Sequence, residues 1–451
     1  MDAAAAAATP VADRESLFRH HVATVTERTE AALAEAGYDR LLIHSGRGHA
    51  RFQDDYEPPF RAHPHFVAWV PLLRSEDCLL EIRPGARPRL WRMAPEDFWH
   101  APAPEPASWW ADHFEIETVT TIEQWQQTLE ESAATALIGD PADFGTLGAH
   151  ADLNPSGLVA ALDETRTAKT PWQVECIAAA NRIAVAGHRA AAVAFREGAS
   201  ELDIHLAYLA AAGHDPDTLP YGSIVALNEH AAILHYQYRD RGAPADSRSF
   251  LIDAGADCHG CAADITRTYA REPGLFADLV DEVERMQRRL AASMCAGRSY
   301  VDLHLEAHRG IAEILRGASL CDMPLDAMLE SGVTATFYPH GLGHFLGVQV
   351  HDVAGRVAPD GTSMPPPEGH PALRLTRALA DGNVVTVEPG LYFIPSLLEP
   401  LADSPLSGHF DWGAIEALKP FGGVRIEDDV LVDGNRPRNL TREAWDELEA
   451  K

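Results

Sequence analysis

The stretch LIDAGADCHGCAADITRTY, residues 251–269, is the most informative part of the sequence. Apolar runs flank a polar centre, Asp257 to Gly260, whose composition is typical of a turn, so the stretch predicts a β-hairpin. Folding the hairpin about its midpoint places Asp253 opposite Asp264. Directly opposed carboxylates destabilise a strand pair unless a positive group lies between them. The alternative is two exposed aspartates on a solvated sheet face, but the apolar neighbours favour a buried pair with a cation.

A second cluster, YPHGLGHFLGVQVHD at residues 338–352, holds His340, His344 and His351. The glycines between them argue against a regular helix and allow a ligand or another strand to approach closely. Neutral imidazole is a common ligand of divalent transition metals. A purely structural role for all three histidines is the less favoured alternative.

A third segment, VVTVEPG at residues 384–390, predicts a strand that ends in a turn. Glu388 interrupts its run of apolar and β-branched residues. Burying this carboxylate without a cationic partner or a metal ion would cost several kcal/mol. Glu388 is therefore a third candidate ligand.

The fourth segment, FGGVRIEDD at residues 421–429, alternates apolar and charged residues, as a strand does. This alternation puts Arg425, Glu427 and Asp429 on one face, and by itself it leaves open which carboxylate takes part in the chemistry. For Asp428 and Asp429 we expect a solvated strand edge.

Together these segments offer four strand-borne carboxylates and at least one imidazole. That ligand set suits two divalent ions that share carboxylate bridges. Two ions about 3.5–4 Å apart can activate a shared water and polarise a carbonyl or phosphoryl oxygen. Hydrolysis is therefore the expected class of reaction.

The order Asp253, Asp264, His344, Glu388, Glu427, with its flanking motifs, resembles the pita-bread metallopeptidases. The resemblance is greatest to the bacterial Xaa-Pro dipeptidases (prolidases, PepQ type), which include relatives named organophosphorus acid anhydrolases. It extends to HSG and FQDD, residues 44–46 and 52–55. It implies an α+β protein, in which an N-terminal mixed α/β domain of the creatinase type precedes a pita-bread domain. That second domain is a curved antiparallel sheet with helices, built as two pseudo-symmetric halves.

The resemblance further implies that these five residues bind two divalent metal ions per subunit, with Asp264 and Glu427 as the bridging pair. Manganese is the ion it implies first, and cobalt or iron(II) are the alternatives. It also implies that Glu388 handles the proton of the bridging hydroxide and that His351 stabilises the tetrahedral intermediate.

Further positions match the substrate cleft of this family. Arg374 and Arg425 match basic groups that would bind the free carboxylate of a dipeptide. Asp55 matches a position that reaches the site from the other subunit of a homodimer. The other matching positions are His340, which also counts as catalytic, His235, Tyr221, Leu234 and Tyr300.

We therefore expect hydrolysis of Xaa-Pro dipeptides to an amino acid and proline. The runner-up is a Xaa-Pro aminopeptidase that acts on longer peptides. A side activity on organophosphate esters is a further expectation, because a metal-bound hydroxide also attacks phosphorus. Some pita-bread proteins are binding modules without metal ligands, and creatine hydrolases use the fold without metal. Retention of all five ligand positions argues against both.

The composition excludes several other classes of protein. Of 451 residues, 37 are Lys or Arg and 67 are Asp or Glu, so the formal net charge is −30 and neither nucleic acid nor an anionic membrane is an expected partner. Hydrophobic residues make up 46% of the chain, as in globular proteins. There is no long uninterrupted apolar run and no basic segment before the alanine run at the N-terminus, so we expect a cytoplasmic protein.

The pattern along the chain predicts a disordered tail (1–12), an N-terminal α/β domain (13–165) and a second domain (166–451). The resemblance implies that the first domain dimerises and contributes to the neighbouring site, and that the second is the pita-bread catalytic domain. Thr170 and Gln173 form a capping box around Pro171, so a long helix begins there. The other expected helices are 15–36, 202–212, 277–295 and 301–316. The expected strands are 41–43, 66–73, 78–82, 90–93, 224–226 and 250–253, followed by a strand-rich C-terminal third.

Six scattered cysteines do not form a disulfide framework, which fits a reducing compartment. Cys258 and Cys261 have the spacing of a thioredoxin-like redox pair or of half a zinc site. We do not favour either, because no second such pair follows.

Overall fold

The computed structural model describes residues 13–99, 101, 103–126, 134–143 and 151–450. Its contacts divide the chain into two compact units, and the division falls within helix α7, between Cys176 and Ile177. His259–Cys261 group with the N-terminal unit. The expected tail, 1–12, lies outside the described residues.

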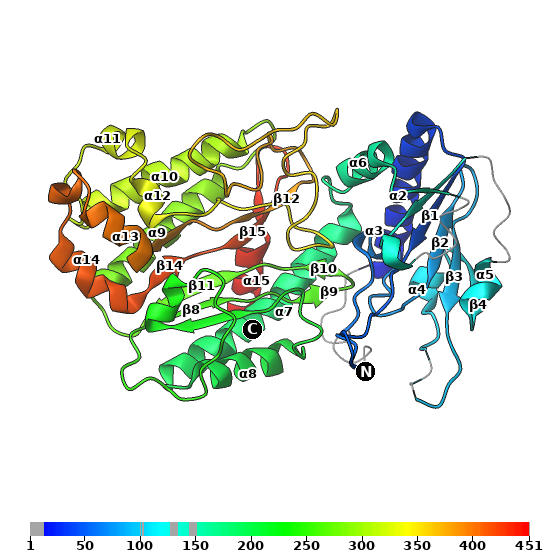
Figure 1. The fold of residues 1–451 in the computed structure, drawn as a ribbon, viewed down its shortest axis with the longest axis horizontal. Helices are drawn as coiled ribbons and strands as arrows, with labels where there is room; N and C mark the ends of the chain where they lie inside the picture. The colour runs from blue at the N-terminus through cyan, green and yellow to red at the C-terminus, as the bar shows by residue number, and fades with distance from the viewer. Residues whose placement is uncertain (1–12, 100, 102, 127–133, 144–150, 451) are drawn as a thin grey trace. The chain divides into compact units, whose positions relative to one another are not determined.

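The N-terminal unit is built around one mixed sheet of strand order β4-β3-β2-β1-β5-β6. Helices α2 and α6 pack against each other beside it (Figure 1). Leu42, Trp91, Trp125 and Leu137 lie in its core. The elements are α2 (Arg14–Ala36), β1 (Arg40–His44), α3 (Pro64–Val67), β2 (Leu79–Ile82), β3 (Arg89–Met93), α4 (Ser108–Ala111), β4 (Glu115–Val119), α5 (Ile122–Gln126), β5 (Thr135–Ile138), the 3-10 helix η1 (Pro141–Asp143), β6 (Asp152–Leu153) and α6 (Ser156–Thr165).

Most predicted elements of this unit are confirmed. Helix α2 ends where Gly37 adopts a left-handed conformation, with φ 77°. The predicted strand 66–73 is wrong, because Pro64 begins the short helix α3 and the ring of His63 accepts a hydrogen bond from His65 N.

Helix α7 (Pro171–Arg196) leads from the N-terminal into the C-terminal unit. The capping box is confirmed, since Thr170 N donates to Gln173 Oε1 at 3.0 Å and Gln173 N donates to Thr170 Oγ1 at 3.3 Å.

The first half of the C-terminal unit is an antiparallel sheet of order β11-β8-β7. Side chains of α7, α8, β7 and β8 share one core, and Figure 1 shows the two helices beside this sheet. The elements are α8 (Glu201–Ala212), β7 (Ile224–Leu227), η3 (Asn228–Ala232), β8 (Ser249–Asp253), β9 (Asp257–Cys258), β10 (Cys261–Ala262) and β11 (Thr266–Ala270).

The second half pairs β12-β15-β16 and β13-β14, again antiparallel, over a large core that includes α9 and α10. Its strands are two to four residues long and helices separate them, so the predicted strand-rich C-terminal third is wrong. The elements are α9 (Leu275–Ala292), α10 (Tyr300–Gly317), α11 (Leu325–Glu330), α12 (Thr334–Phe337), β12 (Val384–Val387), β13 (Gly390–Tyr392), α13 (Pro395–Ala402), η4 (Ser407–His409), α14 (Trp412–Leu418), η5 (Lys419–Phe421), β14 (Gly423–Arg425), β15 (Asp428–Leu431), β16 (Arg438–Asn439) and α15 (Leu440–Glu449).

The predicted hairpin at 251–269 forms, but its register differs from the prediction. His259 and Gly260 make the turn, both with positive φ (52° and 89°), as a tight hairpin turn requires. The midpoint therefore lies one residue further along the chain, and Asp253 pairs with Thr266 instead of Asp264. Asp264 becomes a diagonal neighbour of Asp253 on the same face.

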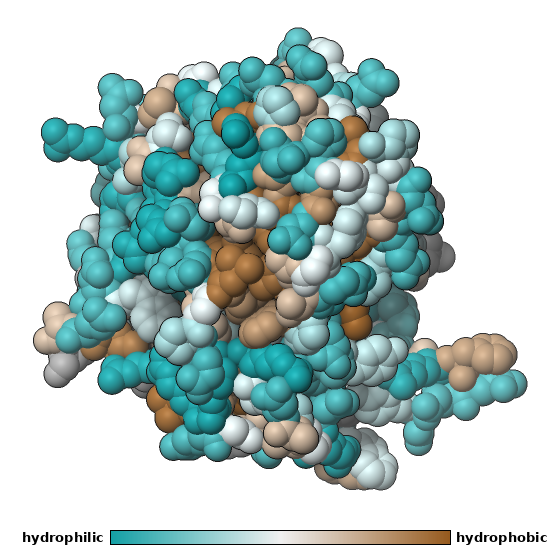
Figure 2. Space-filling view, turned by 90° about the vertical axis from the view of Figure 1, so that its left-hand side faces the viewer, coloured by the Kyte–Doolittle hydropathy of each residue, from teal (hydrophilic) through white to brown (hydrophobic). Residues whose placement is uncertain are grey.

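The face that Figure 2 presents has an apolar patch surrounded by hydrophilic residues. The structure also contains a cavity of about 640 Å³ in the C-terminal unit, with Leu275, Phe276, Leu418 and Phe421 in its lining. No helix in the described part of the chain combines the length and apolar character of a membrane span.

Candidate metal centre

Two pairs of antiparallel strands bring two of the glutamates together. β12 pairs with β15 through Val387 and Asp428, and β13 pairs with β14 through Gly390 and Arg425. Continuing this register across the interruption between the two pairs places Glu388 opposite Glu427. Glu427 is anchored by its backbone N–H, which donates to Thr266 O at 3.0 Å, and so lies against the first half of the unit.

The two aspartates of the hairpin meet at one tyrosine. The Tyr221 hydroxyl lies 2.8 Å from Asp253 Oδ1 and 2.6 Å from Asp264 Oδ1. The positive group expected beside this pair is present, because Arg425 Nη2 lies 2.7 Å from Asp253 Oδ2. The aspartate side chains are only 14% and 7% exposed, so a solvated sheet face is excluded.

His344 is oriented by its own backbone. Its ring Nδ1 lies 2.9 Å from Phe345 O, which fixes Nδ1 as the donor and leaves Nε2 with a lone pair. Nε2 lies 3.5 Å from Asp264 Oδ2 and 3.9 Å from Glu388 Oε1. This is the arrangement of a metal-binding histidine, with one nitrogen held by a carbonyl and the other facing the ligand set.

The electrostatics of this carboxylate cluster (Asp253, Asp264, Glu388, Glu427) favour cations. Burial raises the pKa of Asp264 to about 7, with a further contribution from Asp253, and raises that of Glu388 to about 8. The pKa of Glu427 is raised as well, by burial first and then by the other three carboxylates. Four carboxylates face one buried guanidinium, so ionising all of them requires additional positive charge.

The residues present fit a metal site on the chemistry of their donors. One donor atom from each of Asp264, His344 and Glu427 lies within 4.8 Å of the others, and all three residues are buried. Carboxylate oxygen with one imidazole is a set that divalent ions from manganese to zinc accept.

The predicted histidines around the cluster are found near it. His340 Nδ1 lies 3.7 Å from Glu388 Oε2, and its Nε2 lies 2.9 Å from the Tyr392 hydroxyl. The exposed His351 makes an edge contact with the His344 ring, with centroids 4.4 Å apart. His235 is exposed beside half-buried Leu234. It lies near His351, whose pKa is lowered by burial first, then by Arg374, and to a smaller extent by His235.

The family of the chain can be decided by comparison. Residues 175–434 match the family model described as metallopeptidase family M24. The chain belongs to this family. Residues 16–163 match the model described as the N-terminal domain of Xaa-Pro dipeptidase. The chain is therefore an M24 metallopeptidase with an N-terminal domain of the Xaa-Pro dipeptidase type.

Curated relatives of this M24 chain are similar over nearly its whole length. It is 47% identical to the Xaa-Pro dipeptidase of Pectobacterium atrosepticum, over 95% of this chain and 98% of that protein. It is 46% identical to the enzyme of that name from Escherichia coli, with the same coverage.

Solved structures support the pita-bread fold. Proline aminopeptidase P II from Yersinia pestis is similar with a TM-score of 0.72 at 20% identity, over 95% of this chain and 98% of that one. Zinc-substituted Escherichia coli aminopeptidase P in complex with product has a TM-score of 0.71 at 21% identity, over 94% and 97% of the two chains.

The two predicted arginines of this M24 chain have different environments. Arg425 is buried, and each of its three guanidinium nitrogens donates a hydrogen bond: Nη2 to Asp253, Nη1 to the Tyr392 hydroxyl at 3.0 Å and Nε to Thr266 Oγ1 at 3.2 Å. Arg374 is exposed and makes no hydrogen bond or ion pair within the described residues. Arg374 is therefore the more accessible of the two to a carboxylate from outside.

Tyr300 and Asp55 lie in opposite environments. Tyr300 is 0% exposed, and its hydroxyl donates to Thr386 O at 2.7 Å. It lies near the cluster, since burial and then the charges of Glu388 and Glu427 raise its pKa. Asp55 is exposed in the N-terminal unit, and its expected role in the other subunit's site stays a prediction.

The prediction that Asp428 and Asp429 form a solvated edge is wrong, since both are 0% exposed. Asp428 lies 2.7 Å from Arg267 Nη2 and 2.8 Å from Arg442 Nε. Asp429 Oδ2 accepts from Asn181 Nδ2 and from Asp264 N. The run of charges looked solvated because its partners come from other elements, α7, β11 and α15.

Two residues at the cluster were not predicted from the sequence. Thr266 Oγ1 donates to Glu427 Oε2 at 2.7 Å and accepts from Arg425. Tyr392 connects His340 to Arg425. Thr266 could have been found, because it lies two residues after Asp264 and so shares its strand face.

The cysteine pair is not a metal site. Cys258 and Cys261 are free and buried, and neither belongs to any metal-competent group found within the described residues.

Proposed function

We propose that this M24 metallopeptidase is a Xaa-Pro dipeptidase, which hydrolyses Xaa-Pro to an amino acid and proline. The convergence of Asp264, His344 and Glu427 with Asp253 and Glu388 carries this proposal. The relatives of that name, at 44–47% identity over nearly the whole chain, support the substrate class.

The proposed cofactor is a pair of divalent ions held by Asp253, Asp264, His344, Glu388 and Glu427, with Asp264 and Glu427 bridging. Manganese is the first choice and cobalt or iron(II) the alternatives. When bound, such ions lower the pKa of water and polarise a carbonyl oxygen.

Glu388 is the proposed acceptor of the proton from the attacking water. A pKa raised to about 8 by burial suits a group that must take up and return a proton near neutrality. His340, whose Nδ1 lies 3.7 Å from Glu388 Oε2, is proposed to line the substrate cleft beside it. His351 remains exposed beside the cluster, where a neutral ring could donate a hydrogen bond to a developing oxyanion.

The proposed anchor of the substrate carboxylate is Arg374. It is the exposed, unengaged guanidinium near His351, while the contacts of Arg425 assign that residue to positioning Asp253. Tyr221, Leu234 and His235 remain proposed neighbours of the substrate. Binding of the proline carboxylate would restrict the enzyme to dipeptides, because in a tripeptide the proline carbonyl is a neutral amide and the free carboxylate lies one residue further along.

The test is hydrolysis of Ala-Pro and Ala-Pro-Ala by protein stripped with a chelator and resupplied with manganese. We expect manganese-dependent cleavage of Ala-Pro alone. Cleavage of the tripeptide at a comparable rate would replace the proposal by the runner-up, a Xaa-Pro aminopeptidase. No turnover of either peptide by metal-loaded protein would contradict both.

Activity on organophosphate esters is a secondary proposal that rests on the same ligand set. It is tested with a phosphotriester whose leaving group is chromogenic, and Glu427→Gln should abolish that rate together with peptide hydrolysis. Loss of peptide hydrolysis alone would assign the ester activity to another site.

We also propose two domains, 13–165 and 166–451, and a homodimer formed through the first. Phe52, Tyr56, Phe98 and Trp99 are 50–90% exposed in the N-terminal unit, which favours a covering partner. Asp55 lies among them and would act in the partner's site. Sedimentation equilibrium tests this, and a monomer at micromolar concentration would contradict it. A reducing, cytoplasmic compartment fits the free cysteines.

A further inference from the structure

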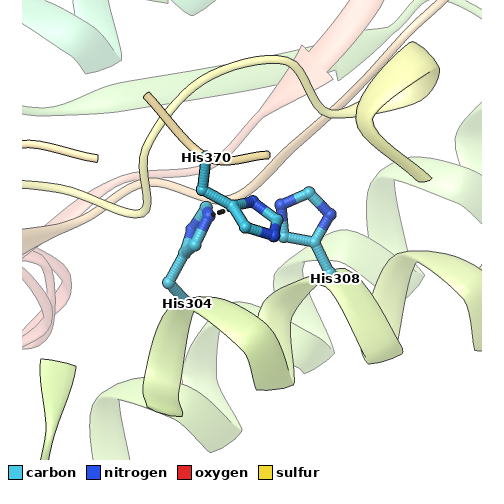
Figure 3. A group of neighbouring side chains, drawn as sticks. All are labelled: His304, His308 and His370. Carbon is cyan, nitrogen blue, oxygen red and sulfur yellow. Dashed lines mark hydrogen bonds between the residues drawn. The ribbon is translucent and has the colours of Figure 1, made fainter. Parts of the chain in front are cut away.

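A second group of metal-binding side chains lies in the C-terminal unit, outside the carboxylate cluster. Helix α10 carries His304 and His308 four residues apart, on one face, and both are buried. The loop before β12 contributes His370. Figure 3 shows the three rings turned toward one another, two from the helix and one from the loop. We call these residues the histidine triad.

The rings of the triad are close enough to share a ligand. Their centroids lie 4.7 Å (304 to 308), 4.7 Å (304 to 370) and 4.5 Å (308 to 370) apart. One ring nitrogen from each histidine lies within 4.8 Å of the other two. Three zinc–nitrogen bonds of 2.0–2.1 Å in a tetrahedral arrangement place the nitrogens about 3.4 Å apart.

Hydrogen bonding within the protein does not satisfy the triad. His304 Nε2 lies 2.9 Å from His370 Nδ1, which accounts for one bond between two rings. His308 uses Nδ1 for Thr334 Oγ1 at 2.9 Å, and its Nε2 is buried with no hydrogen-bond partner among the described residues. A buried ring nitrogen without a partner destabilises a fold unless something else binds it.

The donor chemistry identifies the class of ion. No carboxylate takes part in the triad, so it is unlike the acidic cluster and offers imidazole nitrogen alone. Such a set suits zinc, copper, nickel or cobalt and does not suit magnesium, calcium or manganese. Two histidines four residues apart on a helix are also the spacing with which zinc-binding helices hold their ion.

The triad is adjacent to the proposed active site without being part of it. The Tyr338 ring packs between the two, with centroids 4.7 Å from His308 and 4.9 Å from His340. The same loop continues from His370 to Arg374, and Leu373 N donates to His370 O. An ion held by the triad would therefore fix this loop to α10.

We propose that His304, His308 and His370 form a separate site for one borderline divalent ion of the zinc class. The ion cross-links α10 to the loop that carries Arg374. Its binding is independent of the proposed peptidase activity, so the site can be tested with the acidic cluster disabled.

The test uses the full chain carrying Asp264→Asn and Glu427→Gln, which removes the bridging carboxylates. Zinc is titrated into this chain and into the same chain with His370→Ala added. We chose His370 because it is the least buried member of the triad, so its loss should leave the fold intact. A chain with His409→Ala instead, which removes an exposed histidine bound to Asp322, is the matched control.

We expect one zinc ion per chain in the parent and in the control, and an affinity about 100-fold lower with His370→Ala. X-ray absorption of the zinc-loaded parent should show three imidazole ligands at about 2.0–2.1 Å. Zinc binding that is equal with and without His370, or a spectrum with fewer than three imidazoles, would overturn the proposal.

A second variant tests the site independently, in case His370→Ala does not fold. His308→Asn keeps the position polar but removes the unpartnered Nε2. It should also abolish stoichiometric zinc binding while circular dichroism stays unchanged. A folded His308→Asn chain that retains one tightly bound zinc would likewise overturn the proposal.

Discussion

Glu427 and Asp428 are consecutive residues, both buried, yet their surroundings differ in sign. The pKa of Glu427 is raised by burial and by three neighbouring carboxylates. The pKa of Asp428 is lowered, because Arg267 and Arg442 outweigh the effect of burial. Asp428 has its counterions within the chain, whereas Glu427 belongs to a cluster with surplus negative charge.

This contrast separates a structural carboxylate from one available to a cofactor. A buried acid matched by guanidinium groups is stable in its ionised form and has no need of an ion. A cluster of acids matched by a single arginine is stable in its ionised form only when cations bind. The two residues should therefore respond in opposite ways to removal of charge.

The largest effect is expected from Glu427→Gln. It removes a proposed bridging ligand, so the rate of Ala-Pro hydrolysis should fall by at least about 1,000-fold and metal content should fall with it. The stability of the metal-free protein should not decrease, because the substitution relieves repulsion. Both are measured on one preparation, by turnover and thermal unfolding. A rate within a few-fold of wild type would contradict the proposal that Glu427, unlike Asp428, is a metal ligand.

Asp428→Asn should show the reverse pattern. It leaves buried Arg267 without its counterion, while half-buried Arg442 keeps Glu284, and the loss should cost about 3–5 kcal/mol in the free energy of unfolding. Urea titration measures this. Glu443→Gln is the control, because it breaks an exposed pair with Arg438 and should cost less than about 1 kcal/mol. Equal costs for the two variants would show that Asp428 is not a structural ion-pair partner.

The arginines extend the comparison to positive charge. Arg374→Ala should raise KM for Ala-Pro about 10-fold or more, because it removes an unengaged guanidinium. The kcat should change less, since Arg374 contacts none of the proposed ligands. Arg356→Ala, which removes a nearby arginine bound to the carbonyls of Leu373 and Pro371, is a control for loop disruption. An unchanged KM in Arg374→Ala would remove the proposed anchor.

The smallest effect is a pH dependence of the metal-free protein. With pKa values raised to about 7 and about 8, Asp264 and Glu388 hold protons in the folded chain that they release on unfolding, where carboxyl groups titrate near 4. The folded chain then binds more carboxyl protons, so its stability should fall as pH rises from about 7.5 to 8.5. Histidines with lowered pKa values are neutral in the folded chain, and in the unfolded chain, where their pKa is about 6.5, they have lost most of their protons by pH 7.5.

Thermal unfolding of chelated and manganese-saturated protein across this range measures the difference. Saturation with manganese should remove the slope, because bound cations keep the carboxylates ionised. A rising or flat profile in the chelated protein would contradict the electrostatic description of the cluster.

Most of the carboxylate cluster was predictable because its residues stand out from their neighbours. Asp253, Asp264 and Glu388 are charges within apolar runs, and His344 lies in a glycine-rich segment, whereas Glu427 was distinguished from Asp429 only by the resemblance. The register was not predictable, since the turn at His259 and Gly260 could be placed only from its dihedral angles. The burial of Asp428 could not be predicted from the local sequence, because its arginine partners are at positions 267 and 442.

The histidine triad also could not be predicted from local sequence patterns. His304 and His308 look like ordinary residues of an amphipathic helix, and His370 follows 62 positions later in a proline-rich loop. Tyr300 likewise matched a substrate position by sequence, and only the packing showed that it is completely buried. Local patterns identified the ligands, while tertiary contacts decided which neighbours neutralise them.

The central claim is that the buried acidic cluster hydrolyses the peptide bond only with metal ions bound. The most direct test is titration of manganese into metal-free protein while Ala-Pro hydrolysis and metal content are followed together, for wild type and for Asp264→Asn. We predict that the wild-type rate reaches a plateau at two ions per chain and that Asp264→Asn shows neither stoichiometric binding nor turnover. Full turnover in metal-free protein, or in Asp264→Asn, would contradict the claim.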